Sequence, residues 1–236
     1  MTISFVFTPP ATAGLPVVGT TEQFPVRRIY CVGRNYAAHA REMGFDPDRE
    51  PPFFFCKPGD DASVVPVAAG TTAEMPYPTI TANYHHEIEL VVAIGKGGRD
   101  ITAEDAPAHI FGYAVGLDMT RRDLQMRMRE QGRPWEIGKA FDHSAPIGPI
   151  SMIAETGEIT SGAITLDVDG KRAQSSDLTH LIWSVNETIA NLSTLFALQP
   201  GDLIMTGTPE GVGAVVAGQT MVGSIAGLTP ISVKVI

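Results

Sequence analysis

Residues 85–94 read HHEIELVVAI, an apolar run that carries two glutamates, Glu87 and Glu89, at alternate positions. Because the side chains of a β-strand alternate between its two faces, we expect both glutamates to point the same way. Two like charges on one half-buried face repel each other and lose hydration. They persist there at low cost only beside a cation or facing open water. Taken alone, the pair is equally consistent with a solvated strand face.

A third carboxylate, Asp118, ends a second apolar run, which reads YAVGLD over residues 113–118. Three carboxylates at strand ends, with no cysteine or histidine clearly in the set, favour a hard cation such as Mg²⁺, or Mn²⁺. We therefore predict that Glu87, Glu89 and Asp118 bind a metal ion. The alternative is a solvated strand face with an unrelated aspartate.

Composition and charge define the broad class of protein. The chain has 236 residues, 44% of them hydrophobic, which suffices for one core with at most a small appendage. A formal charge of −9 and two cysteines argue against a nucleic-acid surface and a disulfide framework. No apolar run approaches the roughly 20 residues that span a bilayer, and the first 26 residues lack Lys and Arg, unlike a signal peptide. We expect a soluble, cytoplasmic protein.

Apolar periodicity and turn signals predict a β-rich α+β fold. Strands outnumber helices and do not alternate with them regularly, which excludes a doubly wound sheet. The local signals are a short strand at residues 3–7 in an irregular arm, a helix from near Asn35 to Gly44, a hairpin turn at Asp169-Gly170, and a helix opened by a capping box of Ser184 and Glu187.

The first predicted helix carries His39 and Glu42, which are one turn apart and share a face. A glutamate beside a histidine can orient the ring and raise its basicity, as a general base requires. The same spacing also occurs in ordinary surface pairs. A Pro-bounded loop follows at residues 46–52, so the helix is a candidate lid.

Further polar residues suit recognition of an anion. Arg122 and Gln125 share a helix face and suit a carboxylate or keto oxygen, although the same stretch also resembles a mixed-charge surface. Lys139 is a lone cation in an apolar setting, and a surface lysine is the alternative. The loop TGTPEGVG, residues 206–213, offers N–H groups and hydroxyls to an anion. The loop matches no nucleotide-binding motif. The alternative to an anion-binding loop is an ordinary glycine-rich turn.

Five motifs in this order closely resemble the fumarylacetoacetate hydrolase family: YCVGRNY at 30–36, FFCKP at 54–58, HEIEL at 86–90, GLDMTRRDLQ at 116–125 and TGTPEGVG at 206–213. The resemblance covers about residues 28–236. It implies an N-terminal arm at residues 1–27 and one catalytic domain over residues 28–236. It also implies a mixed β-sandwich roll with a short lid helix, assembled as a homodimer with one Mg²⁺ per subunit.

The resemblance also assigns roles to residues of this sequence. It implies that the metal ligands are Glu87, Glu89 and Asp118. The implied catalytic residues are His39, Glu42 and Lys139. The implied substrate-binding residues are Arg122, Gln125, Thr208 and Lys57.

The activity that the resemblance implies is hydrolysis of the carbon–carbon bond of a 3-acylpyruvate, with fumarylpyruvate from aromatic degradation as the leading candidate. His39 would take a proton from the attacking water. Arg34 and Arg121 are the candidates for binding the far end of the substrate. The alternatives are an oxaloacetate-type decarboxylase, a keto–enol tautomerase or isomerase at the same metal site, and a non-catalytic metal-binding homologue. The expected partner is a small molecule, with no nucleic acid and no membrane.

Overall fold

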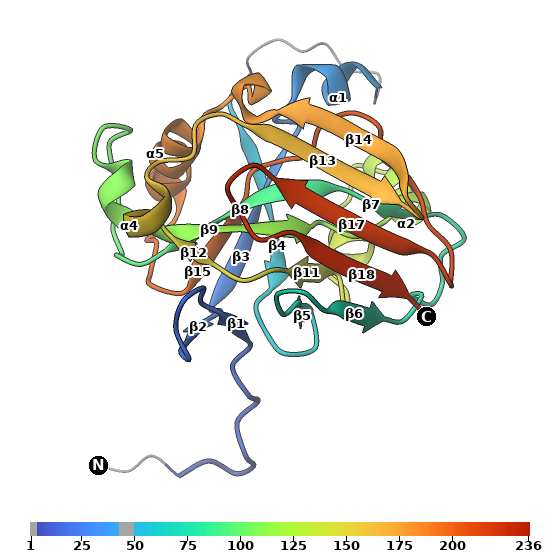
Figure 1. The fold of residues 1–236 in the computed structure, drawn as a ribbon, viewed down its shortest axis with the longest axis horizontal. Helices are drawn as coiled ribbons and strands as arrows, with labels where there is room; N and C mark the ends of the chain where they lie inside the picture. Colours follow the sequence, from blue (N-terminus) through green and yellow to red (C-terminus); the bar gives the residue numbers. More distant parts are fainter. Residues whose placement is uncertain (1–3, 43–49) are drawn as a thin grey trace.

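A computed structural model describes residues 4–42 and 50–236 (Figure 1). Over these residues the strands form two large sheets and two small ones. The largest sheet has eight strands: in spatial order β4 (Phe53–Pro58), β3 (Arg28–Gly33), β15 (Asp202–Met205), β8 (Ile88–Ile94), β9 (Ile110–Leu117), β11 (Ala145–Ile147) and β5 (Val64–Pro66), with β12 (Ser151–Met152) paired to β9.

The other sheets lie around this one. The five-stranded sheet, which Figure 1 shows lying across the larger one, has the order β14 (Lys171–Asp177), β13 (Ala163–Val168), β17 (Thr220–Ile225), β18 (Ile231–Val235) and β6 (Thr72–Met75). The small sheets are β1 (Gly14–Pro16) with β2 (Gln23–Pro25), and β10 (Thr120–Arg121), β7 (Tyr84–His86) and β16 (Gly213–Ala214).

Helices are short and lie at the margins of the sheets. They are α1 (Ala37–Glu42), α2 (Arg122–Glu130), α3 (Glu136–Lys139), α4 (Ile153–Thr156) and α5 (Val185–Leu195), with the 3-10 helices η1 (Ala106–His109) and η2 (Leu178–His180). None of the helices in the described residues is long and apolar enough to cross a membrane.

Strand β8 is covered on both faces, which explains its unbroken apolar sequence. Leu90 and Val92 face the main core between the two large sheets, whereas Val91 and Ala93 face a second core on the other side. A strand buried on both faces has no position for a polar residue unless that residue has a specific partner. The predicted fold class, a β-rich mixed sandwich with a short helix at residues 37–42, is confirmed.

Two local predictions from turn and cap chemistry are confirmed. Ser184 and Glu187 form a complete capping box at the start of α5. Asp169 and Gly170 join β13 to β14, and their φ angles of 49° and 74° are those of a tight hairpin turn. These signals succeed because they depend on neighbouring residues only.

Two other local predictions are wrong. Residues 4–7 form no strand. Asn35 does not cap α1, which begins at Ala37; its side chain instead donates to Thr206 O at 2.8 Å and accepts from Trp183 N at 2.7 Å. A tertiary contact therefore replaces the predicted local one. The predicted end of this helix, Gly44, and most of the loop at 46–52 lie outside the described residues.

The predicted arm is partly built into the body of the protein. Strands β1 and β2 pair with each other, and Leu15 and Phe24 are buried in the second core. Residues 4–11 are exposed and extend away from the sheets (Figure 1). The predicted boundary after residue 27 stays a prediction.

Candidate active site and metal centre

Four strands begin or end at the same edge of the eight-stranded sheet, the edge that runs across the ends of the strands. Strands β3 and β15 are parallel, β8 is antiparallel to β15, and β9 is antiparallel to β8. Strands β3, β9 and β15 therefore end where β8 begins. Because the chain leaves the sheet at this edge, residues from four distant parts of the sequence converge there.

The three predicted carboxylates lie together at this edge. The register pairs Ile88 with Leu117, which places Glu87 opposite Asp118, and Asp118 N donates to Glu87 O at 2.8 Å. Strand alternation then puts Glu89 on the same face as Glu87. One oxygen from each carboxylate lies within 4.8 Å of the others, and all three residues are buried.

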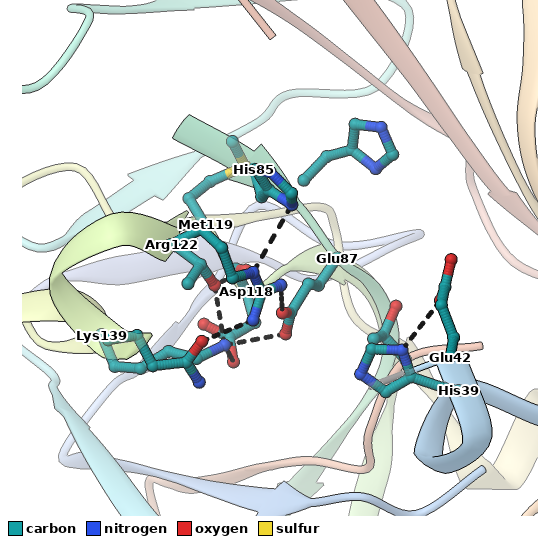
Figure 2. Close-up of polar contacts among 12 residues, drawn as sticks. His39, Glu42, His85, Glu87, Asp118, Met119, Arg122 and Lys139 are labelled. Carbon is teal, nitrogen blue, oxygen red and sulfur yellow. Dashed lines mark hydrogen bonds and ion pairs between the residues drawn. The ribbon is translucent and has the colours of Figure 1, made fainter. Parts of the chain in front are cut away.

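Two basic side chains contact Glu87, as Figure 2 shows. Lys139 Nζ donates to Glu87 Oε2 and to Asp118 Oδ2, each at 2.8 Å, and Arg122 donates to Glu87 Oε1. Burial raises the pKa of Glu87, but the charges of Lys139 and Arg122 outweigh burial and hold this pKa below its usual range. Glu87 is thus an anion stabilised by two neighbouring cations.

The ammonium group of Lys139 is held in a fixed position. It donates to Thr120 Oγ1 at 2.7 Å besides its two carboxylate contacts. Burial lowers the pKa of Lys139, but the charges of Asp118 and Glu87 outweigh burial and raise it above its usual value. Lys139 is therefore a positive charge at the floor of the site and not the snorkelling surface residue of the alternative reading.

Glu89 differs from Glu87 in its surroundings. Burial, with the charges of Asp118 and Glu87 added to it, raises the pKa of Glu89 well above its usual value. Its Oε2 accepts a hydrogen bond from Gly207 N at 2.6 Å. Among the ion pairs of the described residues, none involves Glu89. An added cation is the partner that would stabilise its charged form.

Asp118 supplies a second oxygen suited to a metal ion. Lys57 Nζ forms an ion pair with Asp118 Oδ1 at 2.8 Å, and within the described chain this buried oxygen has no partner besides that ammonium group. Hard divalent ions take such carboxylate oxygens. The donor set of Glu87, Glu89 and Asp118 therefore fits Mg²⁺ or Mn²⁺ and can hold a divalent metal ion.

The predicted histidine–glutamate pair also forms. His39 Nδ1 lies 3.3 Å from Glu42 Oε2, and His39 is buried while the Glu42 side chain is partly exposed. Both Glu42 oxygens also accept from Gly211 N at 3.2 Å. The second contact ties α1 to the loop after β15. With Nδ1 turned to Glu42, the ring can present Nε2 to the cleft that His39 lines.

A single open cleft of about 510 Å³ brings these groups together. Its floor carries the three carboxylates and Lys139, and the predicted substrate contacts Arg122, Gln125 and Thr208 line it as well. Its apolar wall includes Phe53, Phe55 and Trp135. A cleft with a charged floor and an aromatic wall suits a small, conjugated organic anion.

Lys57 and Arg121 lie away from the described lining of the cleft. Lys57 lies beneath the carboxylates, where it contacts Asp118 and donates to Met119 O at 3.1 Å. Arg121 stacks over the ring of Phe141, with the guanidinium carbon 4.3 Å from the ring centroid. Of the two arginines considered for the far end of a substrate, only Arg34 lines the cleft.

Sequence analysis missed two polar residues that support the site. Thr120 accepts from Lys139, and Gln174, on β14, donates to Thr208 Oγ1 at 2.9 Å. Thr120 could have been predicted from the sequence, because it lies two residues after the candidate metal ligand Asp118. Gln174 had no such signal, because its side chain reaches Thr208 from a separate sheet, through a contact 34 residues apart in the sequence.

Comparison with known proteins places the chain among enzymes. A family model described as fumarylacetoacetate (FAA) hydrolase C-terminal matches residues 28–236. The chain is 47% identical over 190 residues to a fumarylpyruvate hydrolase from a Ralstonia species, covering 80% of this chain and 95% of that protein. It is 39% identical over 208 residues to an oxaloacetate tautomerase of Arabidopsis thaliana, covering 88% and 90%.

A solved structure is similar along nearly the whole chain. It is that of fumarylpyruvate hydrolase from Pseudomonas aeruginosa in complex with Mn²⁺ and pyruvate. The two chains are 64% identical, the TM-score is 0.96, and the match covers 99% of both. A relative with this fold therefore binds a divalent metal ion together with a three-carbon keto acid.

Proposed function

The chain belongs to the fumarylacetoacetate hydrolase family, and we propose that it hydrolyses the carbon–carbon bond of a 3-acylpyruvate, with fumarylpyruvate as substrate and fumarate and pyruvate as products. The observation that carries this proposal is that the His39–Glu42 pair lines the same cleft as Glu87, Glu89 and Asp118. A base beside a metal site supplies what hydrolysis needs and tautomerisation does not, namely a means to activate water.

The floor of the cleft would bind the pyruvate end of the substrate. Glu87, Glu89 and Asp118 would hold the metal ion. When bound, a divalent ion supplies Lewis-acid stabilisation of negative charge at this end. The Arg122–Gln125 pair would bind the carboxylate and the 2-keto oxygen through hydrogen bonds. Lys139, whose three N–H groups already bind Glu87, Asp118 and Thr120, would stabilise this anionic end by its positive charge.

Thr208 contributes a hydroxyl whose direction its neighbour sets. Because Thr208 Oγ1 accepts from Gln174 Nε2, its own O–H hydrogen is left to donate to another group. Thr208 lines the cleft, so we place this hydrogen against an oxygen of the substrate. This donor would strengthen as negative charge develops during the reaction.

His39 would act as the general base. It takes a proton from a water molecule, and the resulting hydroxide attacks the 4-carbonyl carbon of the substrate. The bond between carbons 3 and 4 then breaks, its electron pair passes to the pyruvate fragment as an enolate, and protonation of carbon 3 gives pyruvate. The acyl fragment leaves with the oxygen of the water as fumarate. Glu42 orients the ring and stabilises its protonated form.

Substitution of His39 tests the proposal. We expect His39→Ala to lower kcat for fumarylpyruvate by about 10²- to 10⁴-fold, the range for loss of a general base. Binding of Mg²⁺, followed by calorimetry, should stay unchanged, since the three carboxylates remain. The matched control is His180→Ala, because His180 is exposed and is not among the described cleft residues.

A second candidate function uses the same floor without an attacking water. The similarity to an oxaloacetate tautomerase supports keto–enol chemistry on oxaloacetate as this second function. Decarboxylation or isomerisation could use the same site. Oxaloacetate turnover that survives in His39→Ala, together with a wild-type protein inactive on acylpyruvates, would establish this alternative in place of hydrolysis.

The remaining parts of the proposal concern the domain boundaries, the oligomeric state and the cellular role. We place the catalytic domain at residues 28–236, as the range of the family match supports, with residues 1–27 as an arm. We further propose a homodimer in the cytoplasm that serves the degradation of aromatic compounds. Light scattering on the purified protein tests the dimer by its mass.

A further inference from the structure

The outer part of the cleft carries two arginines that the proposed reaction does not use. Arg34 directly follows β3, and Arg129 lies in the last turn of α2. Both are half-buried and line the same cleft as the acidic triad. They therefore add positive charge to a site whose floor is already occupied by its own cations and anions.

One face of α2 runs along the cleft. Arg122, Gln125, Met126 and Arg129 all line it, and their spacing is that of a single helix face. At the rise of an α-helix, Arg129 lies about 10 Å further along the axis than Arg122. Arg122 contacts Glu87 at the floor, so Arg129 marks the opposite end. This span suits an extended molecule with a carboxylate at each end.

An aromatic wall joins the two ends. The ring of Phe53 packs on Gly33 so closely that a Cβ there would lie 2.0 Å from it, and it meets Trp135 edge-on at 5.5 Å. The Arg34 guanidinium carbon lies 5.3 Å from the same ring centroid. Stacking on a ring orients the plane of a guanidinium group, and arginine binds a carboxylate through N–H groups that lie in this plane.

The backbone and the charges at Arg34 also point to a ligand. Its φ of 57° is uncommon for a residue with a side chain and costs energy. Burial and the positive charge of Arg129 lower the pKa of Arg34, and Glu50 opposes them. Both guanidinium groups line the outer part of the cleft, where their positive charges favour an anionic ligand.

We propose that Arg34 and Arg129 bind the far carboxylate of the substrate, so that this cleft prefers dicarboxylic acylpyruvates to monocarboxylic ones. The inference rests on the proposed function for the position of the pyruvate end. The planar, conjugated middle of the substrate would lie along Phe53 and Trp135.

Binding of two matched keto acids tests the subsite without turnover. Both 2-oxoheptanedioate and 2-oxoheptanoate carry the 2-keto acid end and lack a 4-keto group, and only the first has a far carboxylate. Calorimetry with the Mg²⁺-loaded protein should show the dicarboxylate binding about ten- to a hundredfold more tightly, as expected for hydrogen bonds to a charged group. Equal affinities would overturn the proposal.

Substitutions assign the preference to the two arginines. Arg34→Gln and Arg129→Gln should each lose most of it, and Arg129→Lys, which keeps the charge, should retain part. Arg127→Gln is the matched control, because Arg127 is exposed on the same helix and does not line the cleft. A preference that persists in both glutamine variants, or that falls equally in Arg127→Gln, would contradict the assignment.

A kinetic experiment tests the same preference during turnover. It compares fumarylpyruvate with acetylpyruvate, which lacks the far carboxylate. Arg129→Gln should lower kcat/KM about ten- to a hundredfold for fumarylpyruvate, mainly through KM, and less than twofold for acetylpyruvate. If neither compound is hydrolysed by the wild-type protein while the binding preference depends on Arg129, the subsite stands and the proposed hydrolysis fails. An equal loss on both compounds refutes the subsite.

Discussion

Gln174 Nε2, on the five-stranded sheet, donates a hydrogen bond to Thr208 Oγ1 in the cleft at 2.9 Å. The same nitrogen donates to Pro209 O at 2.8 Å, and Oε1 accepts from Ile88 N at 3.1 Å and lies 3.0 Å from His86 Nδ1. Gln174 is fully buried, and both ends of its amide are used. One residue thus connects the strand of the metal ligands to the loop of the substrate contact.

Replacing Gln174 should weaken both stability and substrate binding. In Gln174→Leu the free energy of unfolding should fall by about 1–3 kcal/mol, because buried partners lose their hydrogen bonds. Gln174→Glu keeps the acceptor for Ile88 N but cannot donate to Thr208, so KM should rise in this variant as well. Urea titration and steady-state kinetics measure these effects. Gln131→Leu, at an exposed site, is the control, and a Gln174 variant that matches it in KM would refute the positioning role.

Gly207 should be required for the geometry of Glu89. Its φ is 99°, its N–H donates to Glu89, and a Cβ would lie 2.7 Å from Asn35 Cβ. We expect Gly207→Ala to lose about 1–3 kcal/mol of unfolding free energy from backbone strain, with the clash adding to this loss. Its Mg²⁺ affinity should fall as the N–H moves.

A second glycine provides the control for backbone strain. Gly218 has a φ of 94°, and nothing lies within 4 Å of a Cβ placed there. Gly218→Ala should therefore show the strain without the clash and without an effect on Mg²⁺ binding, as measured by calorimetry. Equal losses of stability and equal Mg²⁺ affinities in the two variants would show that Gly207 has no special role.

Asp123 should make stability depend on pH in the acid range. Burial raises the pKa of Asp123, but its hydrogen bonds from Thr81 Oγ1 and Ala82 N outweigh burial and lower it. A carboxyl with a lower pKa in the folded state contributes stability above the unfolded pKa of about 3.9, and this contribution disappears as the pH falls through the folded pKa.

The Asp123→Asn variant tests that linkage. It should be less stable than the wild type at about pH 6, and the difference should narrow toward about pH 3.5. Urea midpoints at the two pH values measure the difference, with Asp61→Asn at an exposed position as control. A difference that stays constant or widens in acid would contradict the prediction.

The acidic triad was predictable because it depends on the period of a strand. Glu87 and Glu89 share a face by alternation alone, and Asp118 follows the partner strand at the matching position. The structure adds that Glu87 lies between β7 and β8, whose pairing partners differ. The spacing of His39 and Glu42 was equally informative, since one helical turn brings them together.

Residues that depend on long-range pairing escaped prediction. Gln174 reaches Thr208 across two sheets, and Asn35 contacts Trp183 and Thr206 in place of the helix end. Arg129 belongs to the stretch that resembles a mixed-charge helix surface, and only the structure shows that it lines the cleft. In each case the contact joins segments that only the complete set of strand pairings brings together.

Turnover of fumarylpyruvate with and without a divalent ion tests the central claim most directly. The loss of substrate absorbance should depend on Mg²⁺ or Mn²⁺, stop on chelation and resume when either ion is restored. One fumarate and one pyruvate should form for each substrate consumed. A metal-loaded, folded protein that leaves fumarylpyruvate intact and acts on oxaloacetate alone would contradict the account.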